Sequence, residues 1–155
     1  MRPSDEARIH STRMTLLLLH AASTLFMTGL IWFVQVVHYP LGAVVGADAF
    51  SAYQAAHMRR TGWVVGPPML VEAACAAALV VSPATAGSTA WLGLGLLALV
   101  WGSTALLQVP NHNALLAGPD PARLRSLVTG NWVRTVGWTA RSALALSLLN
   151  GSGAS

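Results

Sequence analysis

The sequence predicts an all-α protein, a bundle of four transmembrane helices with a short interfacial helix between the first two. Hydrophobic residues make up 54% of the 155 residues and charged residues only 9%, against about 25% charged in an ordinary soluble domain. Apolar segments of roughly 20 residues, long enough to cross the hydrocarbon of a bilayer, recur four times. A proline follows each of the first three segments and should end the helix there.

The four transmembrane helices are expected to form one integral membrane domain over residues 1–155. The predicted ranges are about Met14–His38, Gly62–Ser82, Ser88–Val109 and Asn131–Leu149, with a flexible tail after the last of them. Pro40, Pro83 and Pro110 are the expected stops. The first apolar run is too long for the roughly 7–15 residues of a signal-peptide core, so we expect it to be retained as a helix.

The connections between the predicted helices are unequal in length. Ser82–Gly87 is a short turn without charges, whereas Tyr39–Thr61 and Asn111–Gly130 are longer and more polar. Four crossings would place the two long loops on one membrane face, and both termini with the short turn on the other. The sequence therefore predicts that polar side chains gather at one face.

The first long loop contains the pattern of a short amphipathic helix. Asp48 is a plausible N-cap, and the helix should end near Arg60. Phe50, Tyr53 and His57 follow helical spacing and would share one face. Two interpretations remain open for this helix, a simple surface element at the interface or a lid over a site.

The basic residues are all arginine, and the formal net charge is +4. They are scattered along the chain and do not alternate with aromatic residues, so we expect no nucleic-acid partner. Arg2, Arg8 and Arg13 favour a cytoplasmic N-terminus under the positive-inside rule, which would make both termini cytoplasmic. We expect the predicted helices to be surrounded by membrane lipid.

Polar side chains recur along single faces of the predicted helices, and polar groups at membrane depth usually face the interior of a bundle. The stripes are Thr24, Thr28, Gln35 and His38 in the first helix, Trp101, Thr104, Gln108 and either Asn111 or His112 in the third, and Asn131, Arg134, Trp138 and Arg141 in the fourth.

Glu72 is the only acidic residue within the four predicted helices. Glu72 and Arg141 each lie ten residues beyond the start of their helix, about 15 Å deep from the same face. An isolated charge at that depth would be costly, so we predict a Glu72–Arg141 ion pair, with Arg134 as a candidate third member.

Histidines near the long-loop face raise the question of a cofactor. His38, His57 and His112, together with Glu72, are plausible ligands for a transition metal, with iron or copper as the leading candidates. Gln35, Gln108, Asn111 and Tyr53 would surround the cofactor. Alternatives are a haem held by His38 and His112, a quinone headgroup, or no cofactor, with the histidines bonding at helix ends. The chain has no C-x-x-C-H motif for a covalent haem.

Two motifs resemble the signature of the anthrone oxygenase-like family. They are the run Gln108–Leu116 and the segment Asn131-Trp132-Val133-Arg134-Thr135, and His38-Tyr39-Pro40 and Pro68–Glu72 add to the similarity. The resemblance implies a small four-helix protein of a bacterial cytoplasmic membrane that oxygenates an aromatic substrate, although we do not transfer the substrate itself. It also implies pocket roles for His38, Glu72, Asn111, Asn131 and Arg134.

The leading functional hypothesis is a metal-dependent membrane oxidoreductase or oxygenase that acts on a hydrophobic small molecule entering from lipid. Glu72, Asn131, Arg134 and Arg141 are the candidate catalytic residues. The alternative is a non-catalytic accessory subunit, in a homo-oligomer or a larger membrane complex. A transporter is disfavoured because one chain supplies only four helices and has no inverted repeat.

Overall fold

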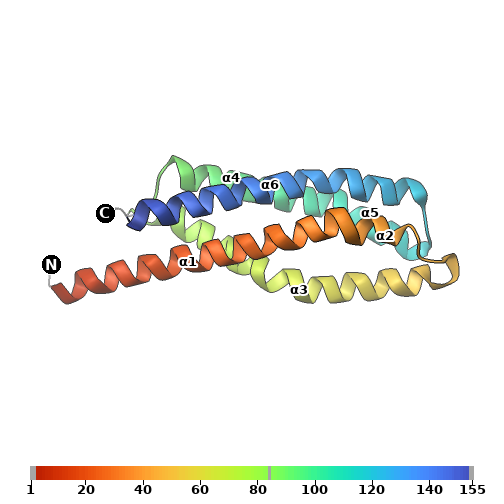
Figure 1. Cartoon of the computed structure of the whole chain (residues 1–155), viewed down its shortest axis with the longest axis horizontal. Coiled ribbons are helices and arrows are strands. Elements are labelled where there is room, and N and C mark those ends of the chain that lie inside the picture. The colour runs from red at the N-terminus through yellow and green to blue at the C-terminus, as the bar shows by residue number, and fades with distance from the viewer. Residues whose placement is uncertain (1–2, 84, 154–155) are drawn as a thin grey trace.

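A computed structural model describes residues 3–83 and 85–153. These residues form four long helices that run alternately up and down along one axis (Figure 1). The connections 43–46 and 118–120 lie together at one end, here called the loop end. Residues 82–83 and 85–87 and the two ends of the described chain lie at the other end, here called the terminal end.

The first and third long helices each contain a π-helical turn. The first consists of α1 Pro3–Phe33, the π turn η1 Val34–His38 and α2 Tyr39–Gly42. The second is α3 Ala47–Val81. The third consists of α4 Ser88–Ser103, the π turn η2 Thr104–Gln108, α5 Val109–Ala114 and the 3₁₀ turn η3 Leu115–Ala117, and the fourth is α6 Pro121–Gly153.

Two prolines that should end helices do not end them. Pro40 and Pro110 lie in the first turn of α2 and α5, each directly after a π turn. A proline is tolerated in the first turn of an α-helix because the backbone N–H groups of that turn have no carbonyl partner within the helix, so the N–H that proline lacks costs little there. The chain therefore stays helical to Gly42 and to Ala117, and the predicted ends at His38 and Val109 are wrong.

The short interfacial helix is also wrong as a separate element. α3 is continuous from Ala47 to Val81, and its N-cap is Gly46, with Asp48 inside the first turn. Gly62 costs a helix only about 1 kcal/mol relative to alanine, which is too little to interrupt it. The first predicted long loop thereby shrinks to residues 43–46.

The fourth helix starts ten residues earlier than predicted, so the second long loop shrinks as well. Asp120 caps it, because its Oδ1 accepts hydrogen bonds from the backbone N–H groups of Ala122 and Arg123 at 2.8 and 3.2 Å. The helix continues to Gly153, into the expected flexible tail. Residues 154 and 155 of that tail lie outside the described residues.

Three of the four long helices are long and apolar enough to cross a membrane, namely Asp5–Gly42, Ala47–Val81 and Ser88–Ala117. α6 does not meet that criterion, and its inner face explains why, because it carries two arginines among several hydroxyl and amide side chains. Large apolar side chains are exposed on all four, for example Phe33, Leu70, Leu106 and Val136. This apolar exterior is consistent with a membrane protein.

The core consists of three apolar clusters along the bundle axis, with buried polar groups between them. Leu17 and Leu79 belong to the cluster nearest the terminal end, Met27 and Trp138 to the middle one, and Phe50 and Leu127 to the one at the loop end. α6 packs against α1 and α4, and α1 also packs against α3. The polar groups between the clusters are the candidates for function.

Candidate functional site

A buried ion pair joins all four long helices near the middle of the bundle. Arg141 Nε donates to Glu72 Oε1 at 2.9 Å, and the two side chains are 1% and 0% exposed. Thr24 Oγ1 and Trp138 Nε1 donate to the two carboxylate oxygens at 2.9 and 3.0 Å. Arg141 also donates to the carbonyl of Gly93. The predicted Glu72–Arg141 pair is confirmed.

Arg134 is not a third member of that ion pair. Its guanidinium carbon lies 5.4 Å from the centre of the Trp138 ring, a cation–π arrangement. The same guanidinium lies beside the hydroxyl of Tyr39. Arg134 is buried one turn closer to the loop end than Trp138 and therefore lies between the ion pair and the histidines.

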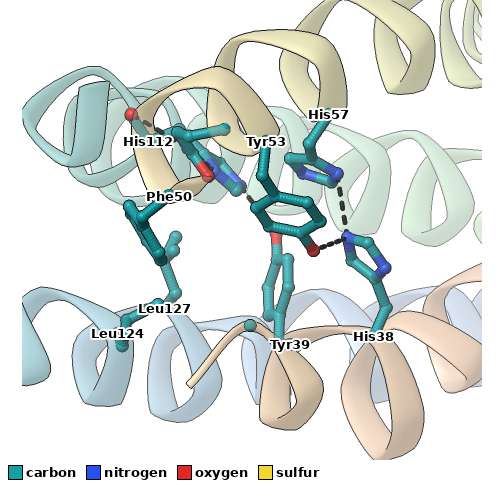
Figure 2. Close-up of a pocket in the computed structure, with 10 residues that line it drawn as sticks. His38, Tyr39, Phe50, Tyr53, His57, His112, Leu124 and Leu127 are labelled. Carbon is teal, nitrogen blue, oxygen red and sulfur yellow. Dashed lines mark hydrogen bonds between the residues drawn. The ribbon is translucent and has the colours of Figure 1, made fainter. Parts of the chain in front are cut away.

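Three histidines meet at the loop end, as Figure 2 shows. His38 comes from η1, His57 from α3 and His112 from α5. His38 Nε2 and His57 Nδ1 are hydrogen-bonded at 2.8 Å, with ring centres 4.5 Å apart, and the His57 and His112 ring centres are 5.1 Å apart. We call these three residues, with Tyr39, Tyr53 and Gln54, the histidine cluster.

Hydroxyl and amide groups orient each imidazole of the cluster. The Tyr39 hydroxyl is 3.0 Å from His112 Nε2, and Gln54 Nε2 is 2.9 Å from His112 Nδ1. Tyr53 Oη lies 3.4 Å from His38 Nε2 and Thr61 Oγ1 lies 3.1 Å from His57 Nδ1. Tyr53 is the one predicted cofactor-binding residue that reaches the histidines.

The histidine cluster surrounds a small internal space and also borders an open one. The internal cavity has a volume of about 20 Å³, enough for a single water molecule. His38, Tyr53 and His57 line this cavity, and the same three residues line an open groove of about 280 Å³ together with Arg60 and Thr61. The hydrogen-bonded imidazoles thus form a wall between cavity and groove.

The predicted four-ligand metal site does not form, because Glu72 lies elsewhere. Glu72 is fifteen residues beyond His57 on α3, which is about 22 Å along the helix axis. His38 Nε2 and His57 Nδ1 are hydrogen-bonded to each other, and the two His112 nitrogens are hydrogen-bonded to Tyr39 and Gln54. Among the described residues, no three His, Cys, Asp or Glu side chains are grouped so as to hold a metal ion.

Gln35, Gln108 and Asn131 form a buried amide layer between the histidine cluster and the ion pair, whereas Asn111 lies beside His112 at the loop end. Asn131 Nδ2 donates to Gln35 Oε1 at 2.8 Å, and Gln35 Nε2 donates to the carbonyl of Val128. Asn111 Nδ2 donates to Ser126, and Asn111 Oδ1 accepts from Arg123 at 3.2 Å. Gln108 is 1% exposed and neither of its amide atoms has a hydrogen-bond partner.

Sequence reasoning missed Tyr39, Gln54 and Thr61 as members or neighbours of the cluster. Helical spacing could have found two of them, Gln54 and Thr61. Gln54 lies four residues after Phe50 and three before His57, and Thr61 lies four after His57, so they share one helical face. Tyr39 lies next to His38 in the sequence. Both side chains face the interior only because of the π turn, and no sequence pattern predicts that turn.

Scans against protein-family profiles, curated proteins and solved structures gave no significant match. The resemblance to the anthrone oxygenase-like family therefore stays a prediction. Function has to be argued from the geometry of the histidine cluster, the amide layer and the ion pair.

Proposed function

We propose that the chain is a small integral membrane oxidoreductase with oxygenase-like chemistry, in which the histidine cluster removes a proton from a hydrophobic substrate. The observation that carries the proposal is the His38–His57 hydrogen bond of 2.8 Å in the wall between the internal cavity and the open groove. Paired imidazoles at such a boundary can accept a proton from one side and pass it on.

The length of α3 supports a location at the membrane face. Its 35 residues extend about 52 Å, whereas the hydrocarbon of a bilayer is about 30 Å thick. With residues 62–81 in lipid, the exposed Arg59 and Arg60 would lie at the headgroups, and His57 beside them. α6 would cross with the other helices, because Arg134 and Arg141 are buried and its outer face is apolar. Both termini would then lie on the same face of the membrane.

The open groove suits a hydrophobic substrate that arrives from lipid. A C–H that is flanked by aromatic rings and conjugated with a carbonyl group is acidic enough for a histidine base, and Arg60 at the groove would stabilise the resulting anion. The net reaction of such a substrate would be R₂CH₂ + O₂ → R₂C=O + H₂O, in which carbon is oxidised and dioxygen is reduced. Tyr53 and Thr61 would orient the two imidazoles during proton transfer.

The proposal routes no step through a metal or haem. His38 Nε2 and His57 Nδ1 are directed at each other, and the His112 nitrogens at Tyr39 and Gln54, an arrangement unlike that of three imidazoles around one ion. A cavity of about 20 Å³ also leaves no room for a haem between His38 and His112. A metal that binds after rearrangement of these side chains is an outcome the experiment detects.

The test is oxygen uptake by the purified protein in lipid nanodiscs, with a panel of polycyclic aromatic ketones that carry an acidic C–H. His38→Ala and His57→Ala should each lower the rate about 100-fold or more, the usual contribution of a general base. His10→Ala is the matched control, because His10 is exposed and lies 28 residues, about 42 Å, from His38 along the first helix.

Two further readouts separate the alternatives. Melting temperatures of the variants show whether lost activity is merely lost folding. Elemental analysis of protein never exposed to chelator shows whether near-stoichiometric metal is present and is lost in the histidine variants, which would replace the proton-transfer model with a metal centre. Full activity in both folded histidine variants would refute the proposed role of the histidines, and no oxygen uptake by the unaltered protein with any ketone of the panel would favour an accessory subunit.

A further inference from the structure

A second open groove lies at the loop end, between α2 and the start of α6. Its volume is about 410 Å³, within the range of roughly 300–1,000 Å³ typical of small-molecule sites. Its walls are mostly apolar, and three prolines, Pro40, Pro119 and Pro121, form part of them. Because proline fixes its own backbone angle φ, these walls are already ordered before any ligand binds.

The packing beneath the groove holds its two sides in place. A Cβ atom at Gly42 would lie 3.8 Å from Leu124 Cδ2, so Leu124 of α6 packs close to α2 over a residue without a side chain. Asp120, between two of the prolines, uses Oδ1 to cap α6. Its negative charge is thus directed at the positive end of that helix.

One cation at the groove has no counter-charge. Arg125 lines the groove and is exposed, and within residues 3–83 and 85–153 its guanidinium has neither a hydrogen bond nor an ion-pair partner. An apolar groove with a single unpaired guanidinium at its edge matches a molecule with an apolar body and one acidic group.

We propose that this groove binds a small hydrophobic organic acid, with its apolar body against the prolines and Val128 and its carboxylate on Arg125. The inference goes beyond the proposed function, because binding requires no turnover and holds even if the histidines are not catalytic. The two sites share Tyr39, whose ring lines both the groove and the internal cavity and whose hydroxyl bonds His112. A bound acid would therefore contact the residue that orients His112.

The experiment uses photolabelling of the full chain in nanodiscs of neutral phosphatidylcholine. The probe is 4-benzoylbenzoate, an aromatic carboxylate that cross-links on illumination, and its uncharged match is 4-methylbenzophenone. Peptide mass spectrometry locates the label. We expect the acid to label residues 39–43 and 119–129 in preference to other exposed segments, and to do so more strongly than the uncharged probe.

Variants then test each part of the site. Arg125→Gln should lower the acid's labelling of the groove about two- to fivefold, the range for an exposed ion pair, whereas Arg59→Gln, exposed on α3, should leave it unchanged. Thr129→Trp should fill the groove and reduce labelling by both probes. Equal labelling by both probes, uniform labelling of all exposed helices, or labelling that survives Thr129→Trp would overturn the proposal.

A last arm separates a free organic acid from an anionic lipid, which offers the same chemistry. Unlabelled benzoylbenzoate added before illumination of a deuterated probe should compete at the groove. Replacement of phosphatidylcholine by phosphatidylglycerol should leave the labelling within twofold. Complete loss of labelling in phosphatidylglycerol would assign the groove to a lipid headgroup and overturn the inference.

Discussion

The Glu72–Arg141 pair predicts that two substitutions together are less damaging than either one alone. Glu72→Met leaves the Arg141 guanidinium buried with one carbonyl partner, at Gly93, and removes the acceptor of Thr24 and Trp138. Arg141→Met leaves a carboxylate that is 0% exposed without its cation. Loss of one partner from a buried ion pair costs about 3–5 kcal/mol, so each single variant should lose that much unfolding free energy.

The double variant Glu72→Met/Arg141→Met removes both charges at once. Trp138 Nε1 then loses its acceptor, which costs about 1–3 kcal/mol for a buried donor. Thr24 can bond to a carbonyl of its own helix, as serines and threonines in helices commonly do. We therefore expect the double variant to lose about 1–3 kcal/mol, less than either single variant.

The assay is reversible unfolding in mixed micelles of a mild detergent and dodecyl sulfate, followed by far-ultraviolet circular dichroism. Arg59→Met is the control, because that arginine is exposed and such substitutions usually change stability by about 0.5 kcal/mol or less. A double variant whose loss equals the sum of the two single losses would refute the reasoning, because it would show that the two charges do not depend on each other.

Three further predictions use the same assay. Gly137→Ala should destabilise by about 1–3 kcal/mol, because its Cβ would lie 2.6 Å from Val100 Cγ2, whereas Gly95→Ala, with no atom within 4 Å, should be neutral or stabilising; equal effects would contradict the close approach of α4 and α6. Asp120→Ala removes the N-cap of α6 and should lower the unfolding free energy by about 1 kcal/mol, whereas Asp120→Asn should keep most of that stability. Gln108→Leu should be neutral or stabilising, because its amide bonds to nothing described, and a loss above about 1 kcal/mol would instead indicate a bound water.

The interior of the bundle could be predicted from sequence where simple helical geometry applies. Depth along a helix is a count of residues, and Glu72 and Arg141 were paired because both lie deep within helices that run in from the same end, although the observed starts of α3 and α6 differ from those used for the count. The same count should have separated Glu72 from His57, because two residues fifteen apart on one helix cannot share a metal ion. The predicted loop between them concealed that distance.

The ends of the first and third long helices could not be predicted because Pro40 and Pro110 were interpreted as terminators, whereas the end of α3 before Pro83 and the start of α4 at Ser88 agree with the prediction to within one residue. At Pro40 and Pro110 a preceding π turn leaves the chain helical, and Pro67 and Pro68 lie within α3. The gathering of three histidines at one end followed from the up-and-down order of the helices. The hydrogen-bond partners of the histidines could not be predicted in the same way. Partners such as Tyr39 depend on the local rotation of the helix about its axis, which sequence periodicity does not encode.

Each of the two π turns rotates the side chains that follow it about the helix axis, relative to their positions in an uninterrupted α-helix. In each turn a backbone N–H, that of Tyr39 or of Val109, donates to a carbonyl five residues earlier, so each helix holds one residue more than an α-helix of the same length would. One residue corresponds to about 100° of rotation. Deletion of a single codon, such as that of Val36, would bring α2 back into phase with α1 and turn Tyr39 away from His112, while the ion pair below kept its register. Chemistry at the loop end could thus be gained or lost by a one-residue insertion or deletion without rebuilding the fold.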